Sequence, residues 1–180
     1  MRVLIDACVL FPTVLRELVL DTSDAGVFQP LWSERILEEW RRAATRLSDS
    51  DGMIAESEIA LIKSRFPKAM VAASEPSMAR LHLPDPDDVH VLAAAIDGRA
   101  SELLTLNLKD FPTRTLSAEG IVRRDPDSFL LEAFHADAEA MRAVIDGVLQ
   151  RAGAVGIDVS NPRAILKKAR VPRLAKAFTA

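Results

Sequence analysis

The sequence contains one cysteine and no long apolar run, and each absence narrows the class of protein. A single cysteine, Cys8, cannot form an intramolecular disulfide or a cysteine-based zinc site. No run of about 18 uninterrupted apolar residues is present, so we expect no membrane-spanning helix. The first six residues lack the apolar core of a signal peptide, so we expect a cytoplasmic protein. Any metal chemistry must therefore use oxygen ligands or the three histidines.

A basic excess is also absent, although the charges are unevenly distributed. The chain has 180 residues, of which 49% are hydrophobic and 27% charged, as in an ordinary globular protein. Residues 1–158 contain 17 Lys and Arg against 26 Asp and Glu, whereas residues 159–180 contain six basic residues and no acidic one. An acidic body argues against a general nucleic-acid binder, which typically carries a basic patch. It is also the composition expected if carboxylates gather at a functional site.

Strand patterns and helix patterns alternate along the chain. Short apolar segments predict strands at residues 2–5, 27–30, 102–106 and 120–123. Helical patterns are found at residues 13–20, 33–47, 54–66, 87–96, 127–134 and 136–151, and a short basic helix begins at Asn161-Pro162. This alternation predicts an α/β protein with a parallel sheet between two layers of helices. The polar segment from Ser48 to Gly52 predicts a turn before the helix at residues 54–66. No internal repeat or low-complexity segment is present.

Polar side chains follow two of the predicted strands at their carboxyl ends. Asp6 comes directly after the first strand, and Thr105, Asn107 and Asp110 follow the strand near residue 104. Ligands of open α/β sheets bind at this edge, so these residues are candidates for a site. Asp6 could instead cap the next helix, and residues 105–112 could be an ordinary turn.

Helical geometry distinguishes between two adjacent glutamates on the helix predicted to begin at Ser33. At 100° per residue, Glu38 points away from the buried stripe, which we expect to include Leu47, whereas Glu39 lies at the edge of the stripe. Glu39 is therefore the better candidate for a crevice over the sheet. The alternative is a boundary glutamate that pairs with a neighbouring arginine.

Helical geometry also distinguishes among the acidic residues at the start of the nearly apolar helix predicted at residues 87–96. Asp87 points away from the apolar stripe and Asp88 lies at its edge, so Asp88 is the better site candidate and Asp85 has a supporting position. Acids at a helix start also complement its dipole, which would account for one or two of the three aspartates. His90 is a weak signal, because it is not three or four residues from Asp88.

Several carboxylates from separate segments form a ligand set that suits Mg²⁺ or Mn²⁺. Such ions, held about 4 Å apart where two bind, activate water and neutralise charge on a phosphodiester during an in-line displacement. Because clustered carboxylates repel one another, we expect the metal-free site to be strained and the metal to stabilise it. The acidic body would then accept nucleic acid only after binding a cation.

Four short motifs occur in an order and spacing that resemble the PIN domain, and in particular the VapC-type toxins of bacterial toxin–antitoxin systems. The resemblance covers about residues 1–130. The motifs are Val3-Leu4-Ile5-Asp6-Ala7, Ser33 with Glu39 six residues later, Asp88 before Leu92-Ala93-Ala94-Ala95, and Thr105-x-Asn107-x-x-Asp110-Phe111-Pro112.

The resemblance implies a three-layer α/β/α fold with a central parallel sheet, and a metal-dependent endoribonuclease that uses Mg²⁺ or Mn²⁺. It also implies an RNA substrate, a homodimer and a protein antitoxin, as expected of the toxin of a type II system. Catalytic and metal-binding roles would fall on Asp6, Glu39, Asp88 and Asp110.

The fourth motif departs from the commoner pattern, which has an aspartate where this chain has Asn107. Asn107 and Thr105 would then orient phosphate or water, and Asp110 would be a ligand or support one. We expect a PIN-like nuclease domain at residues 1–135 and a helical extension with a basic tail at residues 136–180. The tail is either a solvated surface, a phosphate contact or a docking segment for another subunit.

Two other functions are compatible with parts of the sequence. A non-catalytic PIN-like module that binds RNA or a protein would account for Asn107 in an acidic position. A phosphatase of the haloacid dehalogenase type also has an aspartate after its first strand, but it normally needs a second aspartate two residues later, where this chain has Cys8.

Overall fold

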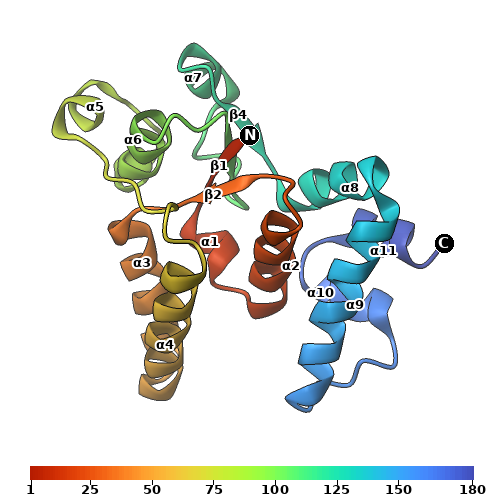
Figure 1. Ribbon diagram of the computed structural model, residues 1–180. Coiled ribbons are helices and arrows are strands. Elements are labelled where there is room, and N and C mark those ends of the chain that lie inside the picture. The colour runs from red at the N-terminus through yellow and green to blue at the C-terminus, as the bar shows by residue number, and fades with distance from the viewer. The chain divides into compact units, whose positions relative to one another are not determined.

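The computed structural model describes all residues from 1 to 180, and the chain forms two compact units (Figure 1). The first unit contains residues 1–11 and 29–123, and the second contains residues 12–28 and 124–180. The chain therefore passes from one unit to the other after Phe11, after Phe28 and after Arg123. No helix is long and apolar enough to cross a membrane.

A four-stranded sheet in the order β2-β1-β3-β4 is the framework of the first unit. Its strands are β1 (Arg2–Ile5), β2 (Gln29–Leu31), β3 (Glu102–Leu104) and β4 (Val122–Arg124). β1 pairs in parallel with both neighbours, with Leu4 opposite Leu31 on one side and opposite Leu103 on the other. The apolar residues of β1 are completely buried, as expected of a central strand covered on both faces. The predicted parallel sheet is therefore confirmed.

Helices flank this sheet in the first unit. They are α1 (Ala7–Leu10), α3 (Glu34–Thr45), α4 (Asp49–Arg65), α5 (Glu75–Arg80), the short 3₁₀ helix η1 (Pro86–Asp88), α6 (Val89–Asp97) and α7 (Thr113–Ala118). Helix α6 packs against β1 and β3, and α3 packs against α1 and α4. Residues 90–95 of α6 are all buried, because this helix is apolar on nearly every side. Ser33 caps α3 as predicted, since its hydroxyl accepts a hydrogen bond from the amide of Ile36.

Two local predictions around the end of α3 are wrong. Leu47 is 69% exposed because α3 ends at Thr45, and Leu37 and Ala44 complete the buried stripe instead. The segment from Ser48 to Gly52 is not a turn but the cap and first turn of α4. A side chain at Gly52 would lie 2.4 Å from the hydroxyl of Thr45, so this glycine permits the close packing of α3 on α4.

The second unit is entirely helical. Its helices are α2 (Thr13–Asp24), α8 (Pro126–Ala136), α9 (Ala138–Ala154), α10 (Pro162–Lys168) and α11 (Pro172–Phe178). Helix α2 packs against α8 and α9, and α11 packs against α8 and α10. The division into a nuclease domain at residues 1–135 and an extension at residues 136–180 stays a prediction.

The basic tail is folded rather than loose, and an aspartate on α8 attaches it. Both carboxylate oxygens of Asp127 accept the amide of Arg173, at 3.0 and 3.1 Å, and one accepts the amide of Leu174 at 3.0 Å. The guanidinium of Arg173 adds an ion pair to the same carboxylate at 3.0 Å. One of the six cations of the tail is therefore used to hold α11, and the other five are exposed.

Candidate metal centre

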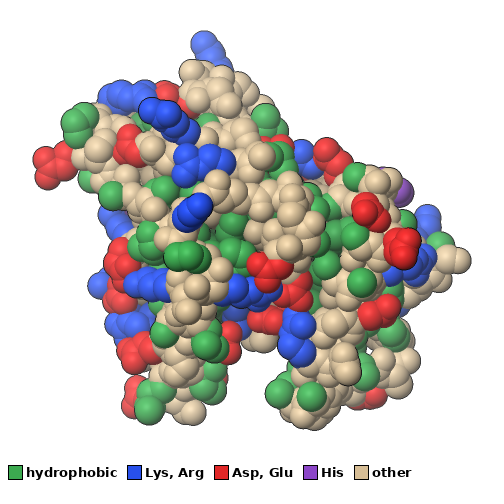
Figure 2. All heavy atoms as spheres, viewed as in Figure 1, with side chains coloured by type: hydrophobic (Ala, Val, Ile, Leu, Met, Phe, Trp, Pro, Cys, Tyr) green, Lys and Arg blue, Asp and Glu red, His purple; other side chains and the backbone are tan.

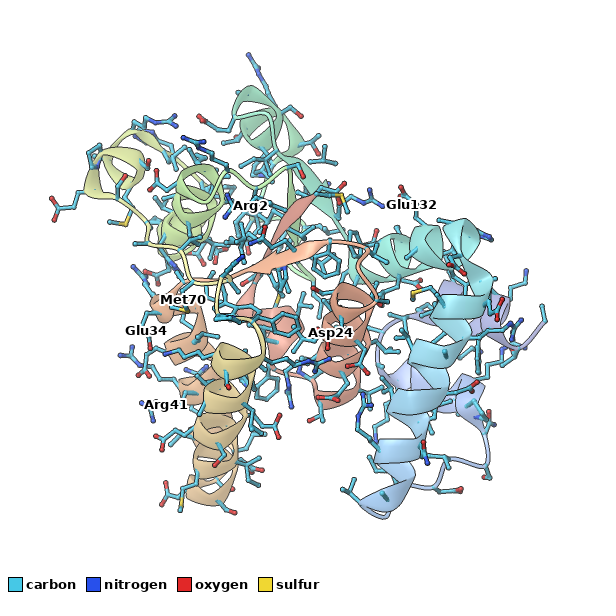
Figure 3. All side chains as sticks on the ribbon, viewed as in Figure 1. Arg2, Asp24, Glu34, Arg41, Met70 and Glu132 are labelled. Carbon is cyan, nitrogen blue, oxygen red and sulfur yellow. The ribbon has the colours of Figure 1, made fainter.

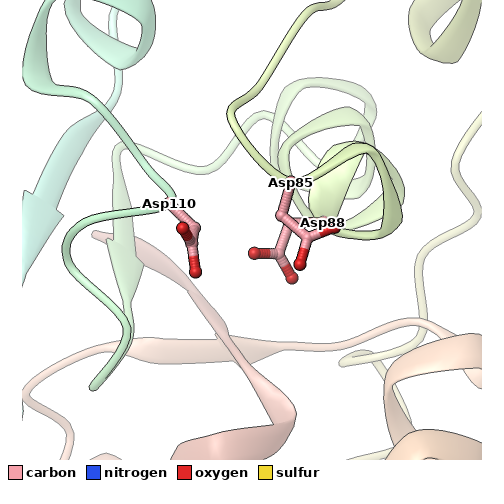
Figure 4. Close-up of side chains that lie close together, drawn as sticks. All are labelled: Asp85, Asp88 and Asp110. Carbon is pink, nitrogen blue, oxygen red and sulfur yellow. The ribbon is translucent and has the colours of Figure 1, made fainter.

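Three carboxylates from two separate segments converge in the first unit (Figure 4). Asp85 precedes η1, Asp88 ends it, and Asp110 lies in the loop after β3. One carboxylate oxygen from each residue lies within 4.8 Å of the others. Asp85 also accepts the amide of Asp87, which fixes the loop at the start of η1. An all-oxygen set of this kind suits a hard divalent cation such as Mg²⁺ or Mn²⁺.

Asp88 is the most perturbed carboxyl of this group. Its Oδ2 atom is buried and has no hydrogen-bond partner. Burial, and after it the negative charges of four neighbouring acids, together raise the pKa of Asp88 to about 6; these acids are Asp6, Asp85, Asp110 and Glu39. A buried carboxylate oxygen without a donor, surrounded by like charges, is an environment that a bound divalent cation would stabilise. The residues present therefore fit a divalent ion.

Asp6 is buried at the carboxyl end of β1, with 6% of its surface exposed. Its Oδ2 atom accepts hydrogen bonds from the hydroxyl of Thr105 at 2.7 Å and from the thiol of Cys8 at 3.1 Å. Burial, followed by the charge of Asp6, raises the pKa of the Cys8 thiol to about 12, so Cys8 stays a neutral donor. Both bonds use Oδ2, which leaves Oδ1 available as a ligand atom.

The loop after β3 holds Asp110 through its own side chains. The buried hydroxyl of Thr105 accepts the amide of Asn107 at 3.0 Å while it donates to Asp6. The side-chain amide of Asn107 donates to the carboxylate of Asp110. Thr105 and Asn107 therefore orient two acidic residues, and their predicted contact with substrate stays a prediction.

Glu39 and Glu38 have similar exposure but different partners. Hydrogen bonds from Arg41, which donates two, and from Arg42, which donates one, lower the pKa of Glu38 to about 2 and hold it in a surface ion-pair network. Glu39 instead lies with its Oε1 atom 2.7 Å from Nε2 of His90 on α6. Its charge also acts on Asp88. Of the two glutamates, Glu39 is thus the one directed toward the carboxylates.

The structure brings the predicted site residues together to different degrees. Asp88 and Asp110 belong to the converging group, and Asp85, predicted only as a supporting residue, belongs to it as well. Asp6 and Glu39 lie outside that group but near enough for their charges to raise the pKa of Asp88. The assignment of metal ligands and catalytic residues to these side chains stays a prediction.

Sequence reasoning missed the contribution of His90, which is 3% exposed, and of Cys8. His90 carried a signal, because it is the only polar residue in the apolar stretch from Val89 to Ile96. A polar residue in a completely buried helix needs a partner inside the fold. Cys8 carried none, since a lone cysteine usually packs as a small apolar residue.

The surface has one hollow that is lined in part by His90 and another that is lined in part by Glu39. A cavity of about 520 Å³ is lined by Ser33, Glu34, Arg35, His90, Met78 and the segment from Met70 to Ala73; Glu34 and Met70 are labelled in Figure 3. A second, of about 400 Å³, is lined by charged side chains of α3 and by Asp87. Figure 2 shows acidic and basic side chains intermixed over α3 and α4. Neither hollow is lined by Asp85, Asp88 or Asp110, so the converging carboxylates lie outside both.

The raised pKa of Asp88 predicts how the stability of the metal-free protein depends on pH. Because the folded protein holds this proton up to about pH 6 and the unfolded chain releases it near pH 4, the proton stabilises the fold at low pH. This contribution is lost as the pH rises through 6. A fully buried carboxyl with this shift would contribute about 3 kcal/mol, and partial exposure reduces the expected value to about 1 kcal/mol.

Thermal unfolding in EDTA between pH 5 and pH 7.5 measures this dependence. We expect the midpoint of the wild-type protein to fall more steeply with pH than that of Asp88→Asn. Parallel curves for the two proteins would contradict the assignment of the effect to Asp88.

Comparison with known proteins agrees with this geometry. A family model described as PIN domain matches residues 2–109. A protein of Mycobacterium tuberculosis (strain ATCC 25618 / H37Rv), named "Putative ribonuclease VapC50", is 45% identical over 62 residues, which are 34% of this chain and 37% of that protein. The matched segment thus covers little more than a third of the relative. No solved structure matches the chain.

The family match agrees with the parallel sheet and its flanking helices, so the predicted three-layer α/β/α fold is confirmed. The matched residues include Asp6, Glu39, Asp85, Asp88 and Asn107, and they end one residue before Asp110. The match covers more than half of the residues of this chain, so the chain belongs to the PIN domain family.

Proposed function

We propose that this protein is a metal-dependent endoribonuclease and the toxin of a type II toxin–antitoxin system. The observation that carries the proposal is the unpartnered, buried oxygen of Asp88 among converging carboxylates. Membership of the PIN domain family and the ribonuclease name of the partial relative support it. The substrate would be RNA, and the cofactor Mg²⁺ or Mn²⁺.

A bound divalent ion would activate water and neutralise charge on the scissile phosphodiester. The residues that would hold it are the converging Asp85, Asp88 and Asp110, together with Glu39 and Oδ1 of Asp6. The side chains around them orient these carboxylates: Thr105 and Cys8 hold Asp6, and Asn107 holds Asp110. Such supporting hydrogen bonds typically contribute 10–100-fold to metal affinity or activity.

The proposed toxin would act in the cytoplasm as a homodimer and would be kept inactive by a protein antitoxin. These three proposals rest on the likeness to VapC-type proteins. The absence of a helix able to cross a membrane is compatible with them.

Incubation of the purified chain with structured RNAs in Mn²⁺ or in EDTA tests the activity. We expect cleavage in Mn²⁺ that stops in EDTA and is lost in Asp6→Asn. The neighbours Glu39 and Glu38 offer a matched pair, because both are half-exposed on α3: Glu39→Gln is expected to reduce cleavage, and Glu38→Gln to leave it unchanged. Cleavage that persists in EDTA would refute metal dependence. Mn²⁺ binding with RNA bound but intact would favour a non-catalytic module.

The basic surface of α10 leads to a separate prediction about RNA binding. Arg163, Lys167 and Lys168 are exposed, and none of them forms an ion pair. If they contact phosphates of single-stranded RNA, neutralising all three reduces the slope of log affinity against log salt by about 2. We expect this result for the triple alanine variant, measured by fluorescence anisotropy with a labelled RNA in EDTA. An unchanged slope would show that this surface does not contact RNA.

A further inference from the structure

A buried histidine on α6 lies against the candidate metal centre. His90 is 3% exposed, and the five residues that follow it on the helix, Val91 to Ala95, are all buried and apolar. Its Nε2 atom lies 2.7 Å from Oε1 of Glu39, but neither ring nitrogen forms a hydrogen bond, so the two atoms are close without being aligned. The imidazole thus has one polar neighbour, Glu39, and an unused donor beside it.

The burial of this imidazole lowers the stability of the fold unless its hydrogen bonds to water are replaced. Burying a polar group in an apolar environment costs about 1–3 kcal/mol when its hydrogen bonds are not replaced. An aliphatic side chain would fill the same helix position without that cost. Packing alone therefore does not explain a histidine here.

The contacts of Glu39 indicate what the histidine does. Arg35 lies 3.4 Å from Oε1, the same oxygen that faces His90. Both neighbours thus use Oε1, and Oε2 is left without a contact. This pattern matches that of Asp6, where Thr105 and Cys8 both use Oδ2. In each case two side chains lie against one oxygen of a carboxylate and leave the other available.

We propose that His90 is the positioning residue of Glu39: a small rotation of the ring aligns its Nε2–H group with Oε1, and the resulting hydrogen bond holds Oε2 ready to bind the cation. The inference rests on the proposed metal-dependent function, because it makes Glu39 a ligand. Hydrogen bonds between histidine and carboxylate that orient a metal ligand are common in metal sites, and their loss lowers metal affinity.

Two substitutions of His90 separate positioning from packing. The amide nitrogen of glutamine reaches about as far from the main chain as Nε2 of histidine, whereas that of asparagine ends near the place of Nδ1. His90→Gln therefore keeps a donor for Glu39, and His90→Asn does not. Both variants lose the ring, so both disturb the packing of α6.

Calorimetric titration of the metal-free full chain with Mn²⁺ tests the inference. We expect His90→Asn to bind Mn²⁺ about 10–100-fold more weakly than the wild type, and His90→Gln to stay within a few-fold of it. Equal losses in the two variants, or none in His90→Asn, would overturn the inference. Thermal unfolding in EDTA measures how much each variant loses in stability from the disturbed packing of α6. We expect the unfolding midpoints of the two variants not to follow the order of their Mn²⁺ affinities.

A double-mutant cycle gives a second measurement of the same coupling. If His90 acts through Glu39, His90→Asn has no further effect on Mn²⁺ affinity in a Glu39→Gln background. Additive losses would overturn the inference. RNA cleavage is not part of either measurement. A wild-type protein that binds Mn²⁺ but cleaves no RNA would therefore refute the proposed nuclease and leave the role of His90 intact.

Discussion

Replacement of Asp88 by asparagine is expected to stabilise the metal-free protein while it reduces RNA cleavage at least about 100-fold. The two effects have one cause. In the absence of metal, Asp88 is a partly buried carboxylate surrounded by the charges of Asp6, Asp85 and other acids, and its pKa is raised to about 6. An amide removes this repulsion at pH 7.5, and the same change removes the negative ligand on which cation binding depends.

Thermal unfolding at pH 7.5, with and without Mn²⁺, measures both effects. We expect Asp88→Asn to raise the midpoint in EDTA by about 2–4 °C, which corresponds to about 1 kcal/mol for a chain of this size. Mn²⁺ is expected to raise the midpoint of the wild type and to leave the variant unchanged. Asp87→Asn is the matched control, because Asp87 is the adjacent, exposed aspartate of η1. A destabilised Asp88→Asn protein would contradict the proposed strain.

Replacement of Asp127 by alanine is expected to cause the largest loss of stability in the second unit, about 2–4 kcal/mol. Its buried carboxylate accepts the amides of Arg173 and Leu174 and pairs with the guanidinium of Arg173. Alanine leaves the two amides without their acceptor and removes one partner of the guanidinium, which keeps its bonds to Asp125 and Ser128. Because these bonds attach α11 to α8, we expect α11 to detach before the rest of the unit unfolds.

Asp137→Ala is the matched control for this experiment. Asp137 caps α9 through one exposed hydrogen bond to the amide of Ala140, and the loss of such a cap costs about 1 kcal/mol. Urea unfolding measures the stability of both variants, and hydrogen exchange of residues 172–178 measures the detachment of α11. Equal destabilisation by the two alanines would contradict a special role for Asp127.

The elements that sequence patterns predicted best are those with a single dominant signal. The strand at residues 2–5 is apolar throughout and is found with the same bounds. Ser33 is a strong helix cap, and α3 begins directly after it. Local patterns fail where two signals overlap: the polar segment from Ser48 to Gly52 is typical both of a turn and of a helix start, and only packing against α3 distinguishes them.

Site residues could be nominated from the sequence because strand ends and helix faces have fixed geometry. Edge positions on two helices favoured Glu39 over Glu38 and Asp88 over Asp87, and the placement of these residues in a functional site stays a prediction. The closeness of Asp85 to the carboxylates could not be predicted, since it depends on the path of the loop before η1. Hydrogen bonds such as Cys8 to Asp6 also depend on tertiary packing, for which sequence spacing carries no signal.

The division of the chain into two units affects the order in which its parts can fold during synthesis. Helix α2 lies between β1 and β2 in the sequence, but it packs against α8 and α9, which follow more than one hundred residues later. Because protein synthesis adds about 5–20 residues per second, several seconds pass between the synthesis of α2 and that of the helices it packs against. The second unit can therefore be completed only after most of the chain has been made, whereas the carboxylates of the candidate metal centre have all been synthesised by residue 110.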